Sequence, residues 1–246
     1  MNILNAVIAY KDFEWNDLSQ DELAKYFVIT PNEIKTNLPN VCKYEENPDL
    51  DNRIYGELSH HNYISNSIDF DWIVINQYRR RLELPDYNNI YVPKPHEFVT
   101  SVKEIYSRFH KIEDLNLMTD IIMEEQGMNN SFKLEWMKSL ESNKMICYNM
   151  FSAPKDVYLD WLGTCMNLLD KFKQIKNFTN YNKVVEYYSD KDNKKTHEPY
   201  RVYGFLCERL TNCYFRWYSK YHNDIMNYHN PVCPCPVKLL EKGMIL

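Results

Sequence analysis

The sequence predicts a single α/β domain built around a largely parallel sheet. Short apolar or β-branched runs alternate with longer segments of helical periodicity, which is the pattern of strands joined by crossover helices. The 246 residues show no internal repeat and no linker, and 44% of them are hydrophobic, enough for one core. We therefore expect one domain over residues 1–246, with helices flanking the sheet.

The strands are predicted from apolar and β-branched runs that end at proline or at polar residues. The clearest is WIVIN, which continues directly into Gln77-Tyr78-Arg79-Arg80-Arg81. The predicted strands cover residues 5–10, 26–30, 72–76, 90–92 and 145–151.

Helices are predicted where apolar residues recur at three- and four-residue spacing or where the segment is polar and helix-compatible. They cover residues 17–25, 55–66, 98–110, 112–126, 154–173 and 203–221. Residues 40–52 are expected to be a loop, and residues 177–195 a mixture of loop and helix. Cys233 and Cys235, one residue apart between prolines, have poor geometry for one zinc ion, so a proline-stiffened tail is expected there.

Composition restricts the class of protein. Seven scattered cysteines indicate reduced thiols rather than a disulfide framework. No apolar run is long enough to span a membrane, and the first residues do not resemble a signal peptide, so we expect a cytoplasmic protein. The net charge of −5 argues against a molecule that binds nucleic acid over its whole surface.

A basic cluster follows the clearest strand. In open α/β sheets, ligands bind beyond the carboxyl ends of the strands, and guanidinium groups can hold phosphate with two parallel hydrogen bonds. Arg79, Arg80 and Arg81 therefore suit a diphosphate. The alternative is a basic turn paired with Glu83 or Asp86.

Two later segments carry further candidate chemistry. Gly204 permits close backbone approach near the start of a helix that also carries Arg201, Glu208 and Arg209, and Glu208 could act as a base. The alternative is an ordinary helix with a Glu-Arg pair. Asn149, at the end of a predicted strand, either binds a sugar hydroxyl or forms a turn.

Together these segments resemble a family of bacterial capsule and lipopolysaccharide glycosyltransferases that was first catalogued as a domain of unknown function. The matching segments, in the family's order, are residues 9–11, 51–63, 77–82, 148–151, 158–162 and 201–210. The last one matches R-x-x-G-F-x-x-E-R-L at every fixed position. Two positions differ: Gln77 replaces the histidine of H-Y-R-R-Y-F, and Gly56 replaces the cysteine of C-E-L-T.

The resemblance implies a GT-A-like, Rossmann-type fold and a nucleotide-sugar donor, with a UDP-sugar as the expected one, for a hexosyl- or pentosyltransferase. It implies a donor-binding part over about residues 1–100, an acceptor and catalytic part over about 101–225, and a tail over 226–246. Glu208 is the expected base, with Glu57 as the second candidate. The expected donor-binding residues are Tyr10, Lys11, Asn62, Tyr78, Arg79 and Arg80, and the expected acceptor-binding residues are Asn149, Arg201, Gly204 and Arg209.

No cofactor is expected beyond the donor. Many GT-A enzymes hold a divalent metal with Asp-x-Asp at the strand end, where this chain has Gln-Tyr-Arg-Arg. We expect Arg79 and Arg80 to replace the metal by neutralising the departing diphosphate. The sequence Asp69-Phe70-Asp71 does spell D-x-D, but it precedes the strand and is interpreted as a polar turn.

Three functions remain open. A glycan acceptor, as in capsule or lipopolysaccharide assembly, is favoured by the resemblance. A phage enzyme acting on a hydroxymethylated DNA base is the alternative, since residues 216–221 interleave basic and aromatic side chains and Lys191, Lys194 and Lys195 cluster nearby. A non-catalytic nucleotide-sugar-binding module is the third. The oligomeric state is not predicted.

Overall fold

The computed structural model describes residues 1–47, 52–84, 86–189, 199–222 and 232–240. Among these residues a nine-stranded sheet has the main order β10-β6-β9-β4-β1-β2-β3, with β5 beside β4 and β11 beside β5. Its strands are β1 (Ile3–Ile8), β2 (Tyr26–Thr30), β3 (Asn40–Lys43), β4 (Trp72–Gln77), β5 (Arg80–Leu82), β6 (Ile90–Pro93), β9 (Phe151–Pro154), β10 (Val232–Cys235) and β11 (Val237–Leu239). A separate pair joins β7 (His96–Glu97) to β8 (Lys144–Met145).

The centre of the sheet is parallel. β1 pairs in parallel with both β2 and β4, and β2 pairs in parallel with β3, whereas β9 runs antiparallel between β4 and β6. The chain leaves β1 first toward β2 and β3 and then returns to the other side of β1 as β4. The carboxyl ends of β1 and β4 therefore form a topological switch point, the usual binding crevice of such sheets.

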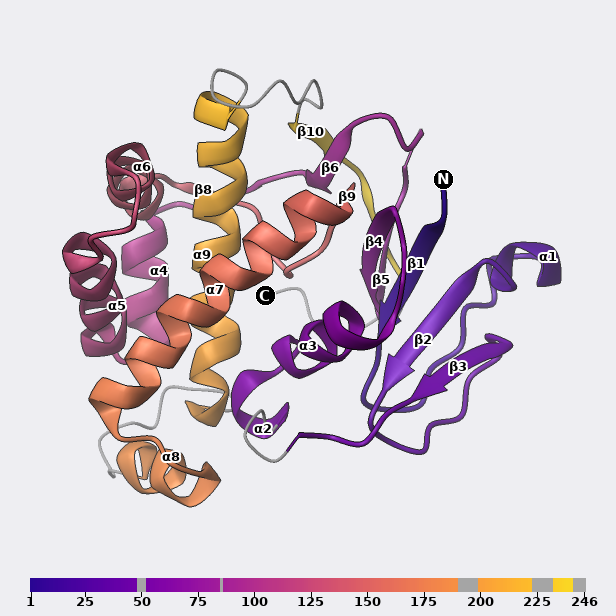
Figure 1. Cartoon of the computed structure of the whole chain (residues 1–246), viewed down its shortest axis with the longest axis horizontal. Coiled ribbons are helices and arrows are strands. Elements are labelled where there is room, and N and C mark those ends of the chain that lie inside the picture. The colour runs from indigo at the N-terminus through magenta and orange to yellow at the C-terminus, as the bar shows by residue number, and fades with distance from the viewer. Residues whose placement is uncertain (48–51, 85, 190–198, 223–231, 241–246) are drawn as a thin grey trace.

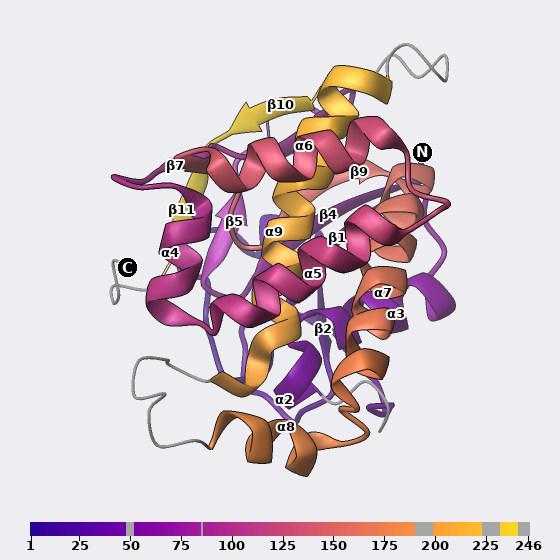
Figure 2. The same ribbon diagram turned by 90° about the vertical axis from the view of Figure 1, so that its left-hand side faces the viewer.

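The helices lie mainly on one face of the sheet (Figure 1), where α3, α7 and α9 are closest and α4, α5 and α6 form an outer layer, also visible from the side (Figure 2). Their bounds are α1 (Gln20–Leu23), α2 (Asn52–Tyr55), α3 (Leu58–Ser67), α4 (Val102–Phe109), α5 (Ile112–Glu124), α6 (Asn130–Glu141), α7 (Lys155–Lys176), α8 (Tyr181–Tyr188) and α9 (Val202–Trp217). A 3-10 turn, Pro199–Arg201, precedes α9, and a π-helical turn, Tyr218–His222, follows it.

Successive residues of β1 enter different cores, as the two-residue period of a strand requires. Ala6 and Ile8 face the helices, whereas Val7 and Ala9 face a smaller cluster that contains Trp15 and lies on the opposite side of the sheet. The predicted α/β domain with a mostly parallel central sheet flanked by helices is confirmed.

Several local predictions were wrong. Residues 40–52, expected to be a loop, contain the edge strand β3, and α6 was not predicted. The strand expected over residues 145–151 is interrupted because Tyr148 and Asn149 adopt positive φ values of 80° and 50°, which no strand accommodates. The Pro/Cys tail forms β10 and β11; β10 tolerates Pro234 because it lies at the sheet edge.

Candidate functional site

Four of the predicted donor-binding residues meet at the switch point. Tyr10 lies two residues after β1 and Tyr78 directly follows β4, and their ring centroids are 5.1 Å apart in an edge-on arrangement. The Lys11 ammonium lies 5.4 Å and the Arg79 guanidinium 5.0 Å from the centroid of the Tyr78 ring. Two cations thus converge around one aromatic ring at the carboxyl edge of the sheet, an arrangement suited to an anionic ligand.

Gln77, the last residue of β4, connects this edge to the neighbouring elements. Its amide nitrogen donates hydrogen bonds to Oε1 of Glu57 and, at 2.8 Å, to the carbonyl oxygen of Tyr148. Its amide oxygen accepts a hydrogen bond from the Arg80 guanidinium at 3.0 Å. The guanidinium also lies 4.0 Å from the centroid of the Tyr148 ring. The Gln77 side chain therefore lies between a carboxyl group and an arginine.

Glu57 occupies the N-cap position of α3 and is buried. Burial raises its pKa to about 8, although the charges of Arg201 and Arg80 and the hydrogen bond from Gln77 act in the opposite direction. The charge of Glu208 raises it further. A carboxyl group with this pKa is mostly protonated at neutral pH.

Gly56 places this carboxyl group by its backbone conformation. Gly56 lies between α2 and α3 and has a φ of 58°, a left-handed conformation that is costly for any residue with a side chain. A Cβ atom at this position would also lie 3.2 Å from a guanidinium nitrogen of Arg201. The glycine thus allows Arg201 to pack against the backbone beside Glu57, while the Arg201 guanidinium lies 5.2 Å from the Tyr10 ring centroid.

Glu208 completes the group of charges from α9. Its carboxylate is 26% exposed and accepts a hydrogen bond from Arg209 at 3.1 Å, and Arg209 also donates to the carbonyl oxygen of Phe205. The charges of Arg80, Arg201 and Glu208 all act on the Glu57 carboxyl group, so these four residues form one cluster. The distant sequence segments did not reveal it by themselves. We call these four residues the charged cluster.

Other predicted site residues have different surroundings. Asn149 is buried, and its amide oxygen accepts a hydrogen bond from Thr211 at 2.8 Å. Asn62 lies within α3, where its oxygens accept hydrogen bonds from Ser65 and Asn66. Gly204 has open space where a Cβ atom would stand. Roles for these three in ligand binding stay predictions.

The third arginine of the basic run has a structural role. Arg81 is buried and donates to Asp17 at 2.8 Å, and Lys238 of β11 contacts the same carboxylate at 2.7 Å. Burial alone would raise the pKa of Asp17, but these two cations hold it at about 2. Arg81 therefore joins the loop after β1 to the tail and is separate from the charged cluster.

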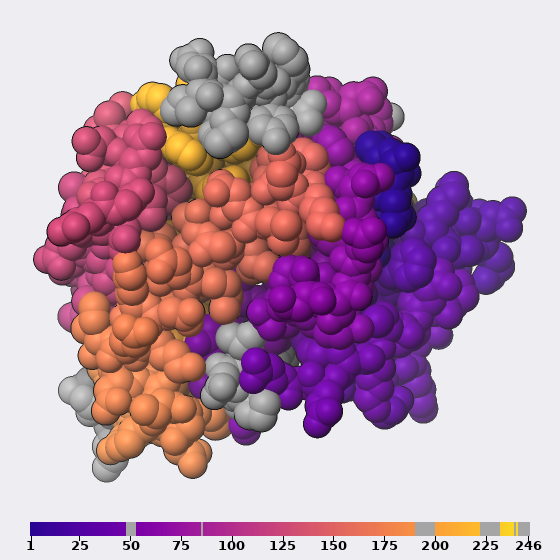
Figure 3. All heavy atoms as spheres, in the orientation of Figure 1, coloured from indigo at the N-terminus to yellow at the C-terminus, as the bar shows by residue number. Residues whose placement is uncertain are grey.

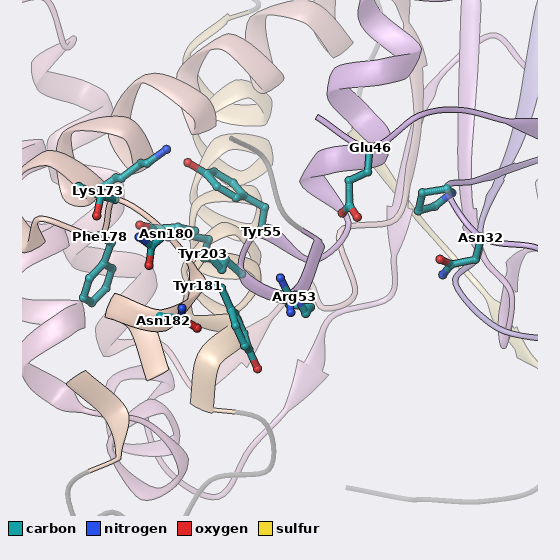
Figure 4. A pocket seen from close by; sticks show the side chains of 13 residues that line it. Asn32, Glu46, Arg53, Tyr55, Lys173, Phe178, Asn180, Tyr181, Asn182 and Tyr203 are labelled. Atoms are coloured by element: carbon teal, nitrogen blue, oxygen red, sulfur yellow. The ribbon is translucent and has the colours of Figure 1, made fainter. Parts of the chain in front are cut away.

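A pocket of about 700 Å³ opens next to the charged cluster. The orange α7–α8 segment and the purple segments around α2 and α3 lie on the same face of the molecule (Figure 3). Figure 4 shows Arg53 and Tyr55 of α2 in its middle, with Lys173 and Tyr181 on one side and Glu46 and Asn32 on the other. The lining residues are Pro31, Asn32, Glu46, Arg53, Ile54, Tyr55, Lys173, Phe178, Thr179, Asn180, Tyr181, Asn182 and Tyr203.

The pocket and the charged cluster share two chain segments. Tyr55 directly precedes Gly56 and Glu57, and Tyr203 lies two residues after Arg201. The Asn32 amide donates to the Tyr10 carbonyl oxygen at 3.1 Å, which joins the end of β2 to the end of β1. Sequence reasoning missed this pocket because its lining comes from six separate segments of the chain and carries no local motif.

Some sequence features lie away from the site. Asp69 contacts Lys155 at 2.7 Å and Asp71 accepts a hydrogen bond from the Asn2 backbone, so the D-x-D sequence lies at the amino end of β4. Arg216 and Lys220 both contact buried Glu135 of α6 at 2.7 Å. Lys191, Lys194 and Lys195 lie outside the described residues.

The described part of the chain contains no cluster of three or more His, Cys, Asp or Glu side chains arranged for a metal ion. Within the same residues, no helix combines the length and the apolarity that crossing a bilayer requires.

A family model described as a domain of unknown function (DUF4422) matches residues 83–220, which is more than half of the chain. The chain belongs to this family. The match includes Arg201, Glu208 and the turn at Tyr148, whereas Glu57 and Arg80 precede it. No curated protein matches the chain.

The DUF4422 chain is similar in structure to a solved protein titled "WbbM bifunctional glycosyltransferase apo structure", with a TM-score of 0.68 and 16% sequence identity. The alignment covers 98% of this chain and 46% of that one, so this chain spans less than half the length of the bifunctional protein. At this identity the likeness shows a common fold. The expected glycosyltransferase-type fold is therefore confirmed.

Proposed function

We propose that this protein is a glycosyltransferase that moves a sugar from a nucleoside-diphosphate sugar to a hydroxyl group. The observation that carries the proposal is the meeting of arginines and carboxyl groups from β5, α3 and α9 beside the carboxyl ends of β1 and β4. Donor departure creates negative charge, and acceptor attack releases a proton, so the reaction needs both kinds of group in one place. The similar fold of a bifunctional glycosyltransferase supports the same reaction class.

In this proposal the diphosphate lies at the switch point, against Lys11, Arg79 and Arg80. Fixed cations there would stabilise the charge that develops as the bond between the sugar and the phosphate breaks. The packing of Arg79 and Arg80 on the Tyr78 and Tyr148 rings restricts both guanidinium groups before the donor arrives.

We place the nucleoside of the donor in the pocket beside α2. The pocket adjoins the end of β2, and in doubly wound sheets the sugar of a nucleotide lies near that strand end when its phosphates lie at the end of β1. Its volume is within the range of about 300–1,000 Å³ that is usual for small-molecule sites. Tyr55, Tyr181 and Tyr203 provide apolar surface, and Asn32 and Asn182 provide amide groups.

Glu208 is the proposed base. Its carboxylate is partly exposed, so an acceptor hydroxyl can reach it, whereas Glu57 is buried and carries a proton at neutral pH. As the acceptor oxygen forms its bond to the anomeric carbon, its proton passes to Glu208. The nucleoside diphosphate leaves with the electron pair of the broken bond.

A glycan is the favoured acceptor. The DNA alternative depended on the basic and aromatic side chains of residues 216–221. However, Arg216 and Lys220 both contact Glu135, and the Trp217 indole donates a hydrogen bond to Ser131 at 2.8 Å. These contacts pack α9 against α6. They leave the DNA reading without its strongest local support among the described residues.

The test combines UDP-, GDP- and CMP-sugars with either a lipid-linked oligosaccharide or DNA containing hydroxymethylcytosine, and detects products by mass spectrometry. A gain of one sugar on the glycan is expected, in the presence of EDTA as well as of manganese. A gain on DNA alone would replace the glycan acceptor, and strict manganese dependence would remove the arginine model. If no donor is hydrolysed or transferred, the glycosyltransferase proposal fails.

The pocket assignment has its own measurement. Tyr181→Ala should weaken UDP binding by about tenfold or more, read by calorimetry, because it removes an aromatic wall that supports Arg53 at 4.1 Å from the ring centroid. Tyr221→Ala, at a half-buried tyrosine outside the pocket, is the control. Equal UDP affinity of both variants would place the nucleoside elsewhere.

A further inference from the structure

The Gln77 side chain uses its amide to join three elements at once. It donates to Glu57 before α3 and to the Tyr148 carbonyl before β9, and it accepts from Arg80 in β5. Both amide hydrogens and one oxygen lone pair are thereby engaged. We propose that Gln77 is a positioning residue that keeps Arg80 directed toward the donor diphosphate and separate from Glu57; this role rests on the proposed function.

The need for such a separator follows from charge. Glu57 keeps its proton in the present arrangement, but a guanidinium in direct contact would favour its ionised form and hold it in a short bidentate pair. Arg80 would then be directed at Glu57 instead of at a ligand. The neutral amide prevents this because its nitrogen satisfies the carboxyl group while its oxygen satisfies the guanidinium. Burial of Gln77 keeps water from replacing either bond.

The third bond of Gln77 fixes the aromatic support of Arg80. Tyr148 and Asn149 both have positive φ, and this turn directs the Tyr148 carbonyl oxygen at the Gln77 amide. The turn is held on its other side by the hydrogen bond from Thr211 to Asn149. The Tyr148 ring then lies beside the Arg80 guanidinium. One amide therefore determines both the hydrogen bond and the ring contact that orient Arg80.

The chain offers a matched control in the preceding residue. Asn76 is also a buried amide of β4, and it makes comparable hydrogen bonds, to the Ala6 carbonyl oxygen and from the Leu82 backbone. These bonds join Asn76 to β1 and β5 rather than to the charged cluster, since neighbouring strand residues point to opposite faces. Gln77→Leu and Asn76→Leu thus remove similar buried bonds, and only the first removes the separator. Gln77→Met is the second variant if Gln77→Leu does not fold.

The first readout is UDP binding by calorimetry, followed by kcat and KM for donor hydrolysis. Gln77→Leu should weaken UDP binding at least tenfold relative to Asn76→Leu, the loss expected for a bond to a charged group, and should raise KM as well as lower kcat. Equal UDP affinities in the two variants, at equal thermal stability, would overturn the proposal.

The second readout needs no substrate. Glu57 is faced by Arg201, Glu208 and Arg80 in addition to Gln77, and the Gln77 hydrogen bond lowers its pKa. In protein labelled with ¹³C-glutamate, Glu57→Gln identifies the resonance. The pKa of the Glu57 carboxyl should fall below its wild-type value in Gln77→Leu and Gln77→Met, because the freed Arg80 guanidinium then pairs with it, and should stay at that value in Asn76→Leu. A rise would reflect only the lost Gln77 hydrogen bond and would also count against the proposal. An unchanged titration in the Gln77 variants refutes the positioning role. Failure of the wild type to bind UDP, with the shift present, would instead count against the donor proposal.

Discussion

At the scale of single residues, the site contains two carboxyl groups with different surroundings. Glu57 is buried between Gln77 and two arginines and keeps its proton at neutral pH, whereas Glu208 is partly exposed beside Arg209. When their surroundings give two carboxyl groups different protonation states, the two groups commonly take different roles. We accordingly assign proton acceptance to Glu208 and a structural role beside the arginines to Glu57.

Replacing Glu208 by Gln should lower the transfer rate by about 10²–10⁴-fold, the usual contribution of a general base, because the amide cannot accept the acceptor's proton. UDP affinity should stay within about twofold, since Glu208 is not assigned to the donor. Rates from saturating-donor assays and affinities from calorimetry separate the two effects. Glu141→Gln, at an exposed residue at the end of α6, is the control; wild-type rates in Glu208→Gln would disprove its role as base.

At the scale of elements, α9 is attached to the outer helical layer by one buried acid. Glu135 of α6 is fully buried and contacts Arg216 at the end of α9 and Lys220 in the π-helical turn that follows. Burial acts to raise the pKa of Glu135, but the two cations outweigh it and the pKa is lowered. Since α9 also carries Arg201 and Glu208, this contact helps to fix the helix that supplies half of the charged cluster.

Glu135→Gln should destabilise the protein by about 3 kcal/mol, at the lower end of the cost of breaking a buried ion pair because Lys220 is nearly half exposed. That corresponds to a fall in Tm of roughly 6–12 °C for a chain of this size. Because folding lowers the pKa of Glu135, its ionised form stabilises the folded state at pH values above the unfolded-state pKa. This stabilisation is lost as the pH falls through the folded-state pKa. The difference in Tm between wild type and variant should therefore shrink below about pH 4.5; a difference that is constant down to pH 3 would contradict this explanation.

The elements that the sequence could predict are those with strong local signals. Residues 26–30 and 72–76 are apolar and β-branched, and both form strands as predicted; each pairs with β1, where Val7 lies opposite Val28 and Asn76. β3 could not be predicted because its residues are polar or half-exposed and its pairing with β2 is a long-range contact. The break at Tyr148 depends on bonds from Gln77 and Thr211, which no local pattern reveals.

At the scale of the whole molecule, the tail braces the segment that carries the arginines. β11 pairs with β5 so that Leu239 lies opposite Arg80, and the Leu240 amide donates to the Arg79 carbonyl oxygen at 2.9 Å. β10 pairs with β6 and buries Cys235. The predicted binding of a donor by Arg79 and Arg80 thus depends on β10 and β11. The sequence predicts a proline-stiffened tail there and no strands.

A chain truncated after His222 should lose more than one order of magnitude in UDP affinity, because β5 loses its partner strand and exposes the arginine segment to exchange. Hydrogen exchange should rise over residues 78–82 while α3 and α7 stay protected. A chain truncated after Leu240 keeps β10 and β11 and is the control. Unchanged exchange over residues 78–82 in the shorter chain would show that β4 alone holds the segment.

The place of β11 in the sheet also bears on synthesis of the protein. A ribosome adds residues in order, and β5 is made long before the strand that pairs with it. Until residue 240 has emerged from the exit tunnel, the Arg79–Arg80 segment lacks the strand that pairs with β5. In the proposed function, donor binding should therefore begin only after β11 has been made and has joined the sheet.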